Sequence, residues 1–326
     1  MNCNNLILMD RHLINEVENR YPYPIASEFR VLNTEEYLKP DSNRLKQILQ
    51  IGEITIQFLA VVVLSDLIEQ NNKKRIFLPE SFKNEFFKNF FKTTFGKWTA
   101  LMRDGIKIFI DNNVEMYINE LPNYFILGRN SESETQKAFN SLTTIRNRIA
   151  HDSIENTSKS IQNLCFEAEA FLETILNNLS FISNYYFLYV GNVSVKNFRW
   201  NDPSFTHSFS EVIGHTSKFS AYLKKLSGLL NTPAIIITKG KEENYLNLDP
   251  LVIYSDEGEN HIPDVFLYID WDIKKGIKYR PVWNGGPFFL ERTQNQHELT
   301  ISLLKVIEFI AKEEDYNKFK VSLSNI

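Results

Sequence analysis

Residues 157–190, TSKSIQNLCFEAEAFLETILNNLSFISNYYFLYV, contain a change of residue pattern that predicts the fold class. Over most of this segment apolar residues recur every three or four positions, which indicates an amphipathic helix that ends near Ser183. The six residues from Tyr185 to Val190 are all apolar or aromatic, which favours a strand. The chain therefore changes from helix to strand near Tyr185, and we expect an α+β protein.

Helical spacing also extends upstream of this segment, back to Arg44. Helices are expected from Arg44 to Glu69, from Pro79 to a break at Gly96, from Trp98 past Phe109, within Val114–Phe125, and from about Ser131 to Ala150. Residues 44–185 should therefore form an all-helical bundle. Residues 1–43 are expected to be an N-terminal arm in which the prolines of YPYP, residues 21–24, favour extended backbone.

The part downstream of Tyr185 is expected to be a smaller β-rich domain, residues 186–292, followed by a C-terminal helix and tail, residues 293–326. Besides the first strand, the pattern predicts strands over 234–238, 245–254, 264–270 and 278–283, and a helix over about 294–312. No internal repeat of useful length is found. The role of this domain is open: it can regulate, recognise a substrate, or hold an antitoxin or sensor partner.

Composition and charge exclude several classes of protein. Two cysteines among 326 residues cannot form a disulfide framework or a thiolate zinc site, and we expect reduced thiols in a cytoplasmic protein. No secretory signal is recognised at the N-terminus. The most apolar segment, residues 51–68, is interrupted by Glu53, Gln57 and Asp66, so a buried core helix is expected and no membrane contact. A net charge of −4 provides no global positive field for nucleic acid.

A local basic segment is nevertheless present between Lys73 and Lys107, with nine Lys and Arg residues against three Asp and Glu. It is either a solvated face over a phenylalanine core or a surface that steers a phosphate backbone. On the second interpretation Lys97 and Arg103 are RNA-binding candidates. Acidic residues dominate between Glu242 and Asp272, which makes the β-rich domain a poor nucleic-acid platform.

The string IRNRIAHD, residues 145–152, combines an arginine, a polar residue directly after it and a histidine five positions after the arginine. It resembles the signature motif of the HEPN superfamily, in the variant that begins with Arg-Asn and ends with Ala-His. The resemblance implies an all-helical, usually homodimeric domain, and many such domains are metal-independent endoribonucleases of toxin–antitoxin, abortive-infection and CRISPR-linked defence. It assigns Arg146 and His151 to the catalytic pair and Asn147 to the supporting polar position.

The chemistry of RNA cleavage fits these residue types. The 2′-hydroxyl attacks the adjacent phosphate, which requires proton transfer and positive charge near the phosphorane. His151 titrates near neutrality and can transfer the proton, whereas Arg146 can contact the non-bridging oxygens. The products are a 2′,3′-cyclic phosphate and a 5′-hydroxyl. No metal and no cofactor are expected.

The spacing of the motif constrains its geometry. Residues five apart on a helix differ by about 140° in azimuth, so Arg146 and His151 cannot share a face of one helix. Asn147 and His151 are four apart and can. Either the helix ends before His151, or a twofold dimer combines motifs from two chains in one cleft. Arg148 is a further RNA-contact candidate, although a solvated surface arginine fits it equally well.

Two alternatives to catalysis remain open at this point. In the first, His151 stabilises the negative end of a helix dipole and Arg146 forms an ion pair with Asp152 or Glu155. In the second, the HEPN module does not cleave RNA and serves for dimerisation, RNA binding or as a scaffold in a defence system.

Other candidate motifs were set aside. The sequence TFGKWT, residues 94–99, lacks the first glycine and the hydroxyl residue of a phosphate loop. Asp264, Asp270 and Asp272 are typical of solvated acids beside a strand rather than a cation site. His207 and His215 have no further ligands at zinc-site spacing.

Overall fold

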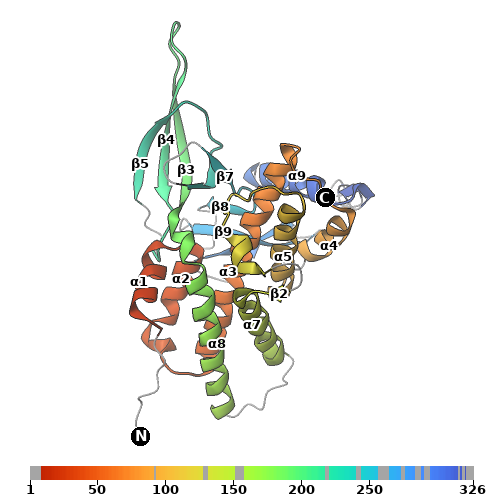
Figure 1. Cartoon of the computed structure of the whole chain (residues 1–326). Coiled ribbons are helices and arrows are strands. Elements are labelled where there is room, and N and C mark those ends of the chain that lie inside the picture. The colour runs from red at the N-terminus through yellow and green to blue at the C-terminus, as the bar shows by residue number, and fades with distance from the viewer. Residues whose placement is uncertain are drawn as a thin grey trace. The chain divides into compact units, whose positions relative to one another are not determined.

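The computed structural model describes residues 9–91, 93–127, 131–150, 158–216, 220–239, 244–255, 264–272, 276–282, 288–289, 294–314, 316–317 and 320. The fold is α+β, as the pattern change near Tyr185 predicts: helices come first, then β-sheets, then a C-terminal helix (Figure 1). The chain divides into two compact units, each made of separate segments. Unit 1 comprises Met1–Gln57, Glu120–Asn184 and Ile213–Thr216, and unit 2 comprises Phe58–Asn119, Tyr185–Val212 and Ser217–Ile326.

One of these divisions, between Asn184 and Tyr185, falls where the helical bundle was expected to end. The others divide segments that appear continuous in the sequence, including the long helix that contains Gln57 and Phe58. Both units are therefore non-contiguous in the chain.

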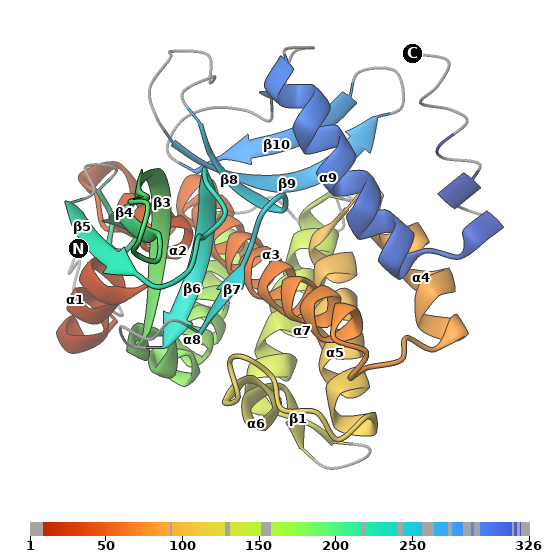
Figure 2. The same ribbon diagram turned by 90° about the horizontal axis from the view of Figure 1, so that it is seen from above.

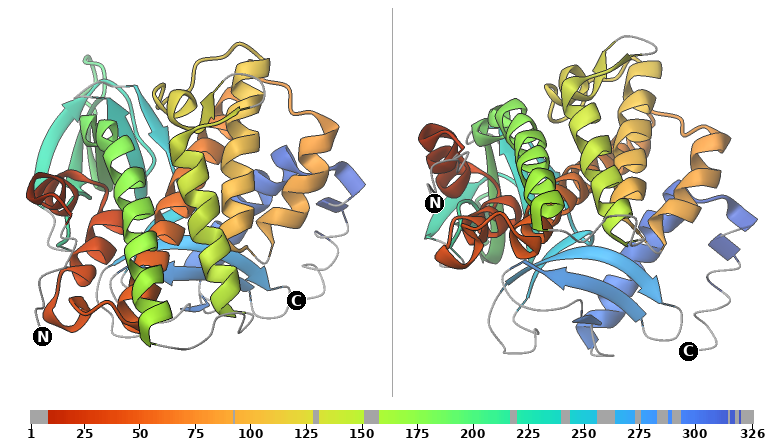
Figure 3. Two further views of the ribbon diagram at one scale, coloured as in Figure 1. Left: turned by 60° about the horizontal axis from the view of Figure 1, so that its bottom comes forward. Right: turned by 90° about the horizontal axis from the view of Figure 1, so that it is seen from below.

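Unit 1 is mainly helical. Its elements are α1 (Arg11–Arg20), α2 (Tyr23–Leu32), η1 (Glu35–Tyr37), the first part of α3 (Ser42–Asn72), α6 (Leu121–Phe125), β1 (Ile126–Leu127), β2 (Ser131–Glu132), α7 (Glu134–Ala150), α8 (Ser158–Asn178) and η2 (Ser180–Asn184). α7 and α8 lie side by side (Figure 3). Their helical pattern and approximate limits agree with the sequence.

The expectation of extended backbone at YPYP holds for Tyr21 and Pro22 but was wrong for Tyr23 and Pro24, which begin α2. Pro22 is the N-cap of α2 and Pro24 lies in its first turn, where the missing amide hydrogen would have no helical partner. Tyr21 and Tyr23 are fully buried, and the Tyr21 hydroxyl donates a hydrogen bond of 2.6 Å to the carbonyl of Leu176. These residues are part of the core of unit 1 rather than a loose arm.

Residues 213–216 join unit 1 from a distant part of the sequence. Ile213 forms an antiparallel bridge with Pro22, and the Gly214 amide donates to the carbonyl of Tyr21 at 2.9 Å. Gly214 has a φ of +73°, and a Cβ at this position would lie 3.3 Å from the carbonyl oxygen of Glu18. Glycine is therefore required for this close approach of two backbones.

The helix α3 is long and apolar enough to cross a membrane, and 89% of its most apolar window is buried within the protein. Such burial is typical of the core helix of a soluble protein. The polar interruptions of its sequence agree with this, because Gln57 and Asp66 are buried and Asp66 has hydrogen-bond partners within the protein.

Unit 2 contains the second part of α3, α4 (Glu80–Phe90), α5 (Phe95–Asp111) and α9 (Gln294–Ile310), which lies against α4 (Figure 2). The predicted break at Gly96 was wrong by a few residues. α4 ends before Phe91, and Gly96 lies in the first turn of α5, whose N-cap Thr94 accepts a hydrogen bond from the amide of Lys97. α5 packs closely on α3, because a Cβ at Gly105 would lie 2.6 Å from Val63 Cγ1.

Unit 2 also contains two antiparallel sheets. The five-stranded sheet has the order β5-β4-β3-β6-β7 and the four-stranded sheet the order β11-β10-β9-β8. The strands are β3 (Tyr185–Lys196), β4 (Ser204–Glu211), β5 (Ala221–Leu226), β6 (Ala234–Lys239), β7 (Tyr245–Asn247), β8 (Val252–Ser255), β9 (Asp264–Asp272), β10 (Gly276–Pro281) and β11 (Phe288–Phe289). The single strand expected over 245–254 was wrong, because a turn at Leu248–Leu251 sends β7 and β8 into different sheets.

Candidate functional site

The helix α7 positions the arginine and asparagine of the IRNRIAHD string. Ser133 precedes its first residue, and the Ser133 hydroxyl accepts a hydrogen bond of 3.0 Å from the amide of Gln136, which fixes the start of the helix. Phe139, Leu142 and Ile145 are buried on one side of α7. This apolar face anchors α7 in unit 1 and determines the directions of the residues in its last turn.

Arg146 and Asn147 have different surroundings in that last turn. Arg146 follows Leu142 and Phe139 at helical spacing, so it lies at the edge of the packed face, and its side chain is half-buried. Asn147 and Arg148 point away from this face and are exposed. Among the described residues, no ion pair or hydrogen bond involves the Arg146 guanidinium.

His151 lies outside the described residues, as do Asp152 and Glu155, the acids considered as alternative partners of Arg146. The structure therefore describes Arg146, Asn147 and Arg148 together at one end of α7, and the position of the imidazole stays a prediction. α7 is helical up to Ala150, the residue before His151.

The end of α7 lies beside the start of α8. Asn178 at the end of α8 donates a hydrogen bond of 2.9 Å to the hydroxyl of Thr135 at the start of α7, so the two helices are antiparallel. Arg146 is consequently on the same side of the pair as the N-terminus of α8. At 1.5 Å per residue from this contact, Arg146 is level with about Glu167 of α8, and the first residue of α8 lies about 13 Å further along the pair.

The other two RNA-contact candidates, Lys97 and Arg103, are on α5 in unit 2. The Lys97 ammonium donates to the carbonyls of Lys88 and Phe91 at 3.0 and 3.1 Å, so it stabilises the C-terminal end of α4. Arg103 forms an ion pair of 3.1 Å with Asp104. These contacts favour a structural use of both cations.

Much of the basic segment from Lys73 to Lys107 is neutralised in the same way. Further ion pairs join Lys73 to Glu69, Lys83 to Glu80 and Lys88 to Glu85 at 2.8 to 3.7 Å. Its phenylalanines form a core, since Phe86 stacks on Phe90 and Phe90 stacks on Tyr268. The described part of this segment fits a solvated face over a phenylalanine core.

The histidines and aspartates that were set aside have local roles. His207 is fully buried, its Nε2 accepts from the amide of Leu230 at 3.1 Å, and burial lowers its pKa. His215 Nδ1 donates to the carbonyl of Glu18 at 2.8 Å. Asp264 and Asp270 each accept from the backbone amide of the following residue. In the described part of the chain, no group of three or more His, Cys, Asp or Glu residues is arranged to hold a metal ion.

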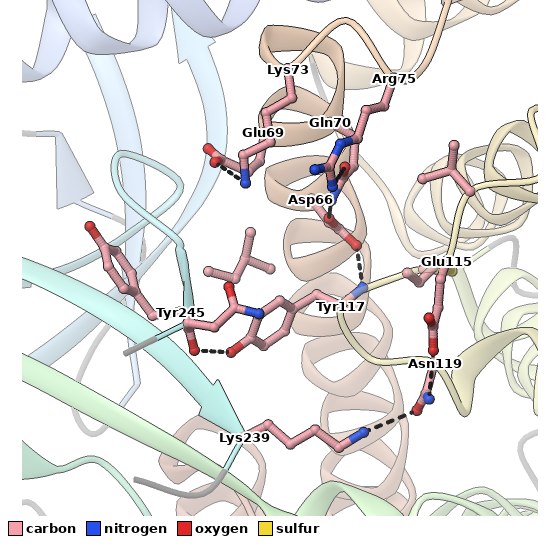
Figure 4. Close-up of a pocket in the computed structure, with 14 residues that line it drawn as sticks. Asp66, Glu69, Gln70, Lys73, Arg75, Glu115, Tyr117, Asn119, Lys239 and Tyr245 are labelled. Atoms are coloured by element: carbon pink, nitrogen blue, oxygen red, sulfur yellow. Dashed lines mark hydrogen bonds and ion pairs between the residues drawn. The ribbon is translucent and has the colours of Figure 1, made fainter. Parts of the chain in front are cut away.

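A pocket of about 350 Å³ in unit 2 was not anticipated from the sequence (Figure 4). Its lining comes from three regions: the end of α3, the segment after α5, and the edge of the five-stranded sheet. The charged and polar residues that line it are Asp66, Glu69, Gln70, Lys73, Arg75, Glu115, Tyr117, Asn119, Lys239, Asn244 and Tyr245. Residues so far apart in the sequence share no local pattern, so no signal could have identified them.

The Asp66 carboxylate is the most perturbed group of this pocket. Burial raises its pKa from 3.8 to about 6, although hydrogen bonds from the Tyr117 amide, at 2.6 Å, and from the Gln70 side chain, at 3.1 Å, favour the charged form. Each of its oxygens thus accepts one hydrogen bond, and Asp66 fastens the segment around Tyr117 to α3. A structural role accounts for these contacts.

The remaining charges of the pocket are balanced. Lys73 pairs with Glu69 at 2.8 Å, and the Lys239 ammonium lies 3.5 Å from Asn119 Oδ1 and 5.6 Å from the centre of the Tyr185 ring. The lining contains three cations, Lys73, Arg75 and Lys239, and three carboxylates, Asp66, Glu69 and Glu115. Such a lining suits a small polar molecule and provides no surplus of positive charge for a nucleic-acid backbone.

No protein-family model, no curated protein and no solved structure matches this chain.

Proposed function

We propose that this chain is a HEPN-type endoribonuclease that cleaves RNA without a metal ion or other cofactor. In this proposal the 2′-hydroxyl of the substrate attacks the adjacent phosphate, and the products carry a 2′,3′-cyclic phosphate and a 5′-hydroxyl. Arg146 contacts the non-bridging oxygens, His151 transfers a proton, and Asn147 orients the imidazole. The enzyme acts in the cytoplasm as a homodimer, as a toxin or an anti-phage effector.

The position of Arg146 is the observation that carries this proposal. A guanidinium that is half-buried is usually paired, because partial loss of hydration disfavours its charge. Arg146 has no such partner among the described residues. An anionic group from outside, such as a phosphate, would complete its environment.

The location of Asn147 supports the same assignment. Asn147 is exposed, and it precedes His151 by four residues, the spacing at which two side chains meet if the helix continues. Arg146 lies on another side of α7, so one chain does not bring all three groups to one helix face. A dimer in which two such helix ends line one cleft satisfies this geometry, because one chain can supply the arginine and the other the histidine.

The test is cleavage of a ribose oligonucleotide by the purified full chain in the presence of EDTA. We expect cyclic-phosphate products from the wild type and a loss of at least a hundredfold in Arg146→Ala and His151→Ala, because each removes a transition-state contact. Lys137→Ala is the matched control, since Lys137 is an exposed cation on the same helix, about two and a half turns from Arg146. It should cleave at the wild-type rate.

The result can also contradict the proposal. Intact RNA with the wild type at all concentrations, together with a dimer in solution, would favour the alternative of a non-catalytic HEPN module. Cleavage that requires added Mg²⁺, or that also occurs with DNA, would exclude attack by the 2′-hydroxyl.

A further inference from the structure

The loop that joins β3 to β4 exposes an unusual set of side chains. Trp200 is 85% exposed, Phe198 64% and Val195 55%, and they lie within six residues of each other at the end of this hairpin. Figure 1 shows that the hairpin end extends beyond the neighbouring strands of its sheet. In contrast, Trp98 and Trp271 are at most 5% exposed.

Exposed aromatic rings this close together indicate that another molecule binds over them. Each leaves a large apolar area in water, at a cost of about 25 cal/mol per Å² relative to burial. Such clusters on a folded surface mark sites of interaction. The charge and polarity of the residues between the rings indicate which class of molecule can bind there.

Those residues are cationic or neutral and polar. The Arg199 guanidinium carbon lies 5.1 Å from the centre of the Trp200 ring, so a planar cation and a planar ring are held side by side. Lys196 precedes them, and the first acid of the loop is Asp202. The hairpin end therefore offers flat surfaces and positive charge together.

The face of the five-stranded sheet next to this hairpin end also carries polar and positively charged side chains. Ser204, Thr206, Ser208 and Ser210 alternate along β4 and so point to one face of the sheet. Lys196 of β3 is paired with Ser204, and Lys225 of β5 is paired with Thr206, so both ammonium groups belong to this hydroxyl-lined face. Lys196 and Lys225 are exposed and form no ion pair with the described residues.

The acids that argued against the β-rich domain as a nucleic-acid platform lie elsewhere. Of those that are described, Asp264, Asp270 and Asp272 are on β9 in the four-stranded sheet, and Asp249 is in the turn between β7 and β8. The strands β3 to β5 and their hairpin end carry Lys196, Arg199, Lys224 and Lys225 against Asp202 and Glu211. One sheet is thus positive although the whole domain is not.

We infer that the β3–β4 hairpin end and the Ser/Thr face of β4 bind single-stranded RNA, with bases stacked on Phe198 and Trp200 and phosphates at Lys196 and Lys225. Aromatic stacking and a basic track are the two components of sequence-tolerant single-strand binding. The choice of RNA over DNA rests on the proposed function. A membrane fits less well, because Arg199 and its flanking residues Asn197 and Asn201 would enter the bilayer with the two rings.

The test uses the full chain and an oligouridylate of about 12 nucleotides whose riboses are 2′-O-methylated, so that it binds but cannot be cleaved. Binding should quench the fluorescence of Trp200, and its affinity should fall with salt at a slope of about −0.7 per phosphate contact. Trp200→Ala and Phe198→Ala should each weaken binding about tenfold, measured by anisotropy of a labelled oligonucleotide. Lys196→Glu should reduce the salt slope.

Phe77→Ala is the matched control, because Phe77 is 78% exposed and follows the basic residues Lys73, Lys74 and Arg75. Its affinity should equal that of the wild type. An equal loss in Phe77→Ala, or no loss in Trp200→Ala, would overturn the inference. So would a blue shift of Trp200 fluorescence with anionic phospholipid vesicles and no response to the oligonucleotide.

Binding and cleavage are measured in separate assays, so the RNA-binding inference and the proposed catalysis can be contradicted independently. Tight binding of the methylated oligonucleotide without cleavage of the ribose form would contradict the proposed catalysis and support the hairpin as an RNA surface. Cleavage by the wild type with an unchanged KM in Trp200→Ala would leave the catalytic proposal in place and overturn the hairpin inference.

Discussion

Arg44 and Arg146 lie on different helices of the same unit and have opposite environments. The Arg44 guanidinium is buried and forms four hydrogen bonds: it donates to both carboxylate oxygens of Glu169, at 2.7 and 3.1 Å, and to the carbonyls of Leu32 and Tyr37. Arg146 is half-buried, and none of its donors is bonded within the described residues. Arg44 therefore has identifiable structural partners, whereas Arg146 has none among the described residues.

The comparison distinguishes an arginine that stabilises the fold, Arg44, from one with a proposed role in function, Arg146. Arg44 fastens α3 to α8 and to the chain between α2 and α3, so its contacts belong to folding. Arg146 makes no such contact with the described residues, and in the proposed function its charge binds a phosphate. Three substitutions test this separation through the free energy of unfolding.

The largest effect is expected for Arg44→Ala. The substitution leaves the Glu169 carboxylate buried without a cation, and breaking a buried pair in this way costs about 3–5 kcal/mol. Urea denaturation measures the change. Arg30→Ala is the matched control, because the Arg30–Glu18 pair is 3.5 Å long with a 49% exposed arginine, and its loss should cost less than about 1 kcal/mol.

The double variant Arg44→Met, Glu169→Met tests whether the unpaired Glu169 carboxylate causes the loss of stability. Replacing both charges by apolar side chains removes the unpaired carboxylate, so most of the lost stability should return. A double variant as unstable as Arg44→Ala would show that the hydrogen bonds to the carbonyls of Leu32 and Tyr37 carry the energy instead.

An intermediate effect is expected for Asp66→Asn, which extends the comparison to carboxylates. Glu169 has a cation, whereas Asp66 forms no ion pair with the described residues and has a pKa raised by burial from 3.8 to about 6. Between these two values the folded state holds a proton that the unfolded state has released, so the free energy of unfolding falls as pH rises. The shift corresponds to about 3 kcal/mol.

Asp66→Asn should remove this pH dependence. The difference in unfolding free energy between variant and wild type should change by about 3 kcal/mol in favour of the variant from pH 4 to pH 7. The amide oxygen can still accept the hydrogen bond from the Tyr117 backbone. A difference that is constant over this range would mean that Asp66 has its ordinary pKa.

The smallest effect is expected for Arg146→Ala. With no partner among the described residues, its removal should change the free energy of unfolding by less than about 0.5 kcal/mol. Circular dichroism during urea denaturation gives this value on the same protein used for the cleavage assay. A loss above about 2 kcal/mol would indicate an ion pair, such as one with Asp152 or Glu155, and would remove the basis of the proposed function.

Elements with a strong local pattern were predictable from the sequence. The apolar spacing of α3, α7 and α8 gave their approximate limits, and the run from Tyr185 to Val190 located the start of β3. The placement of Arg146 and Asn147 in the last turn of one helix also followed from spacing alone. These features depend on neighbours in the sequence, which a pattern can report.

Elements that depend on distant neighbours were missed. β4 was missed although Ser and Thr alternate with Phe205, His207 and Phe209, the period-two pattern of a strand, and its pairing with β3 and β5 identifies it. α2 begins at prolines that indicated extended backbone, and burial of Tyr23 against unit 1 determines its helical state instead. The pocket around Asp66 combines side chains that are up to about 180 residues apart in the chain.

The interleaving of segments has a consequence for any attempt to cut the gene into modules. A fragment from residue 44 to 185 would carry α7 and α8 but lack Tyr21, whose ring fills the core against Leu176, and the strand-like residue Ile213 that bridges to Pro22. Such a fragment would expose apolar surface and is expected to aggregate rather than fold on its own. Fusions, truncations and recombinants should therefore keep all segments of both units. Proteolytic cleavage near Gly214 would disturb unit 1, most of which lies far from Gly214 in the sequence.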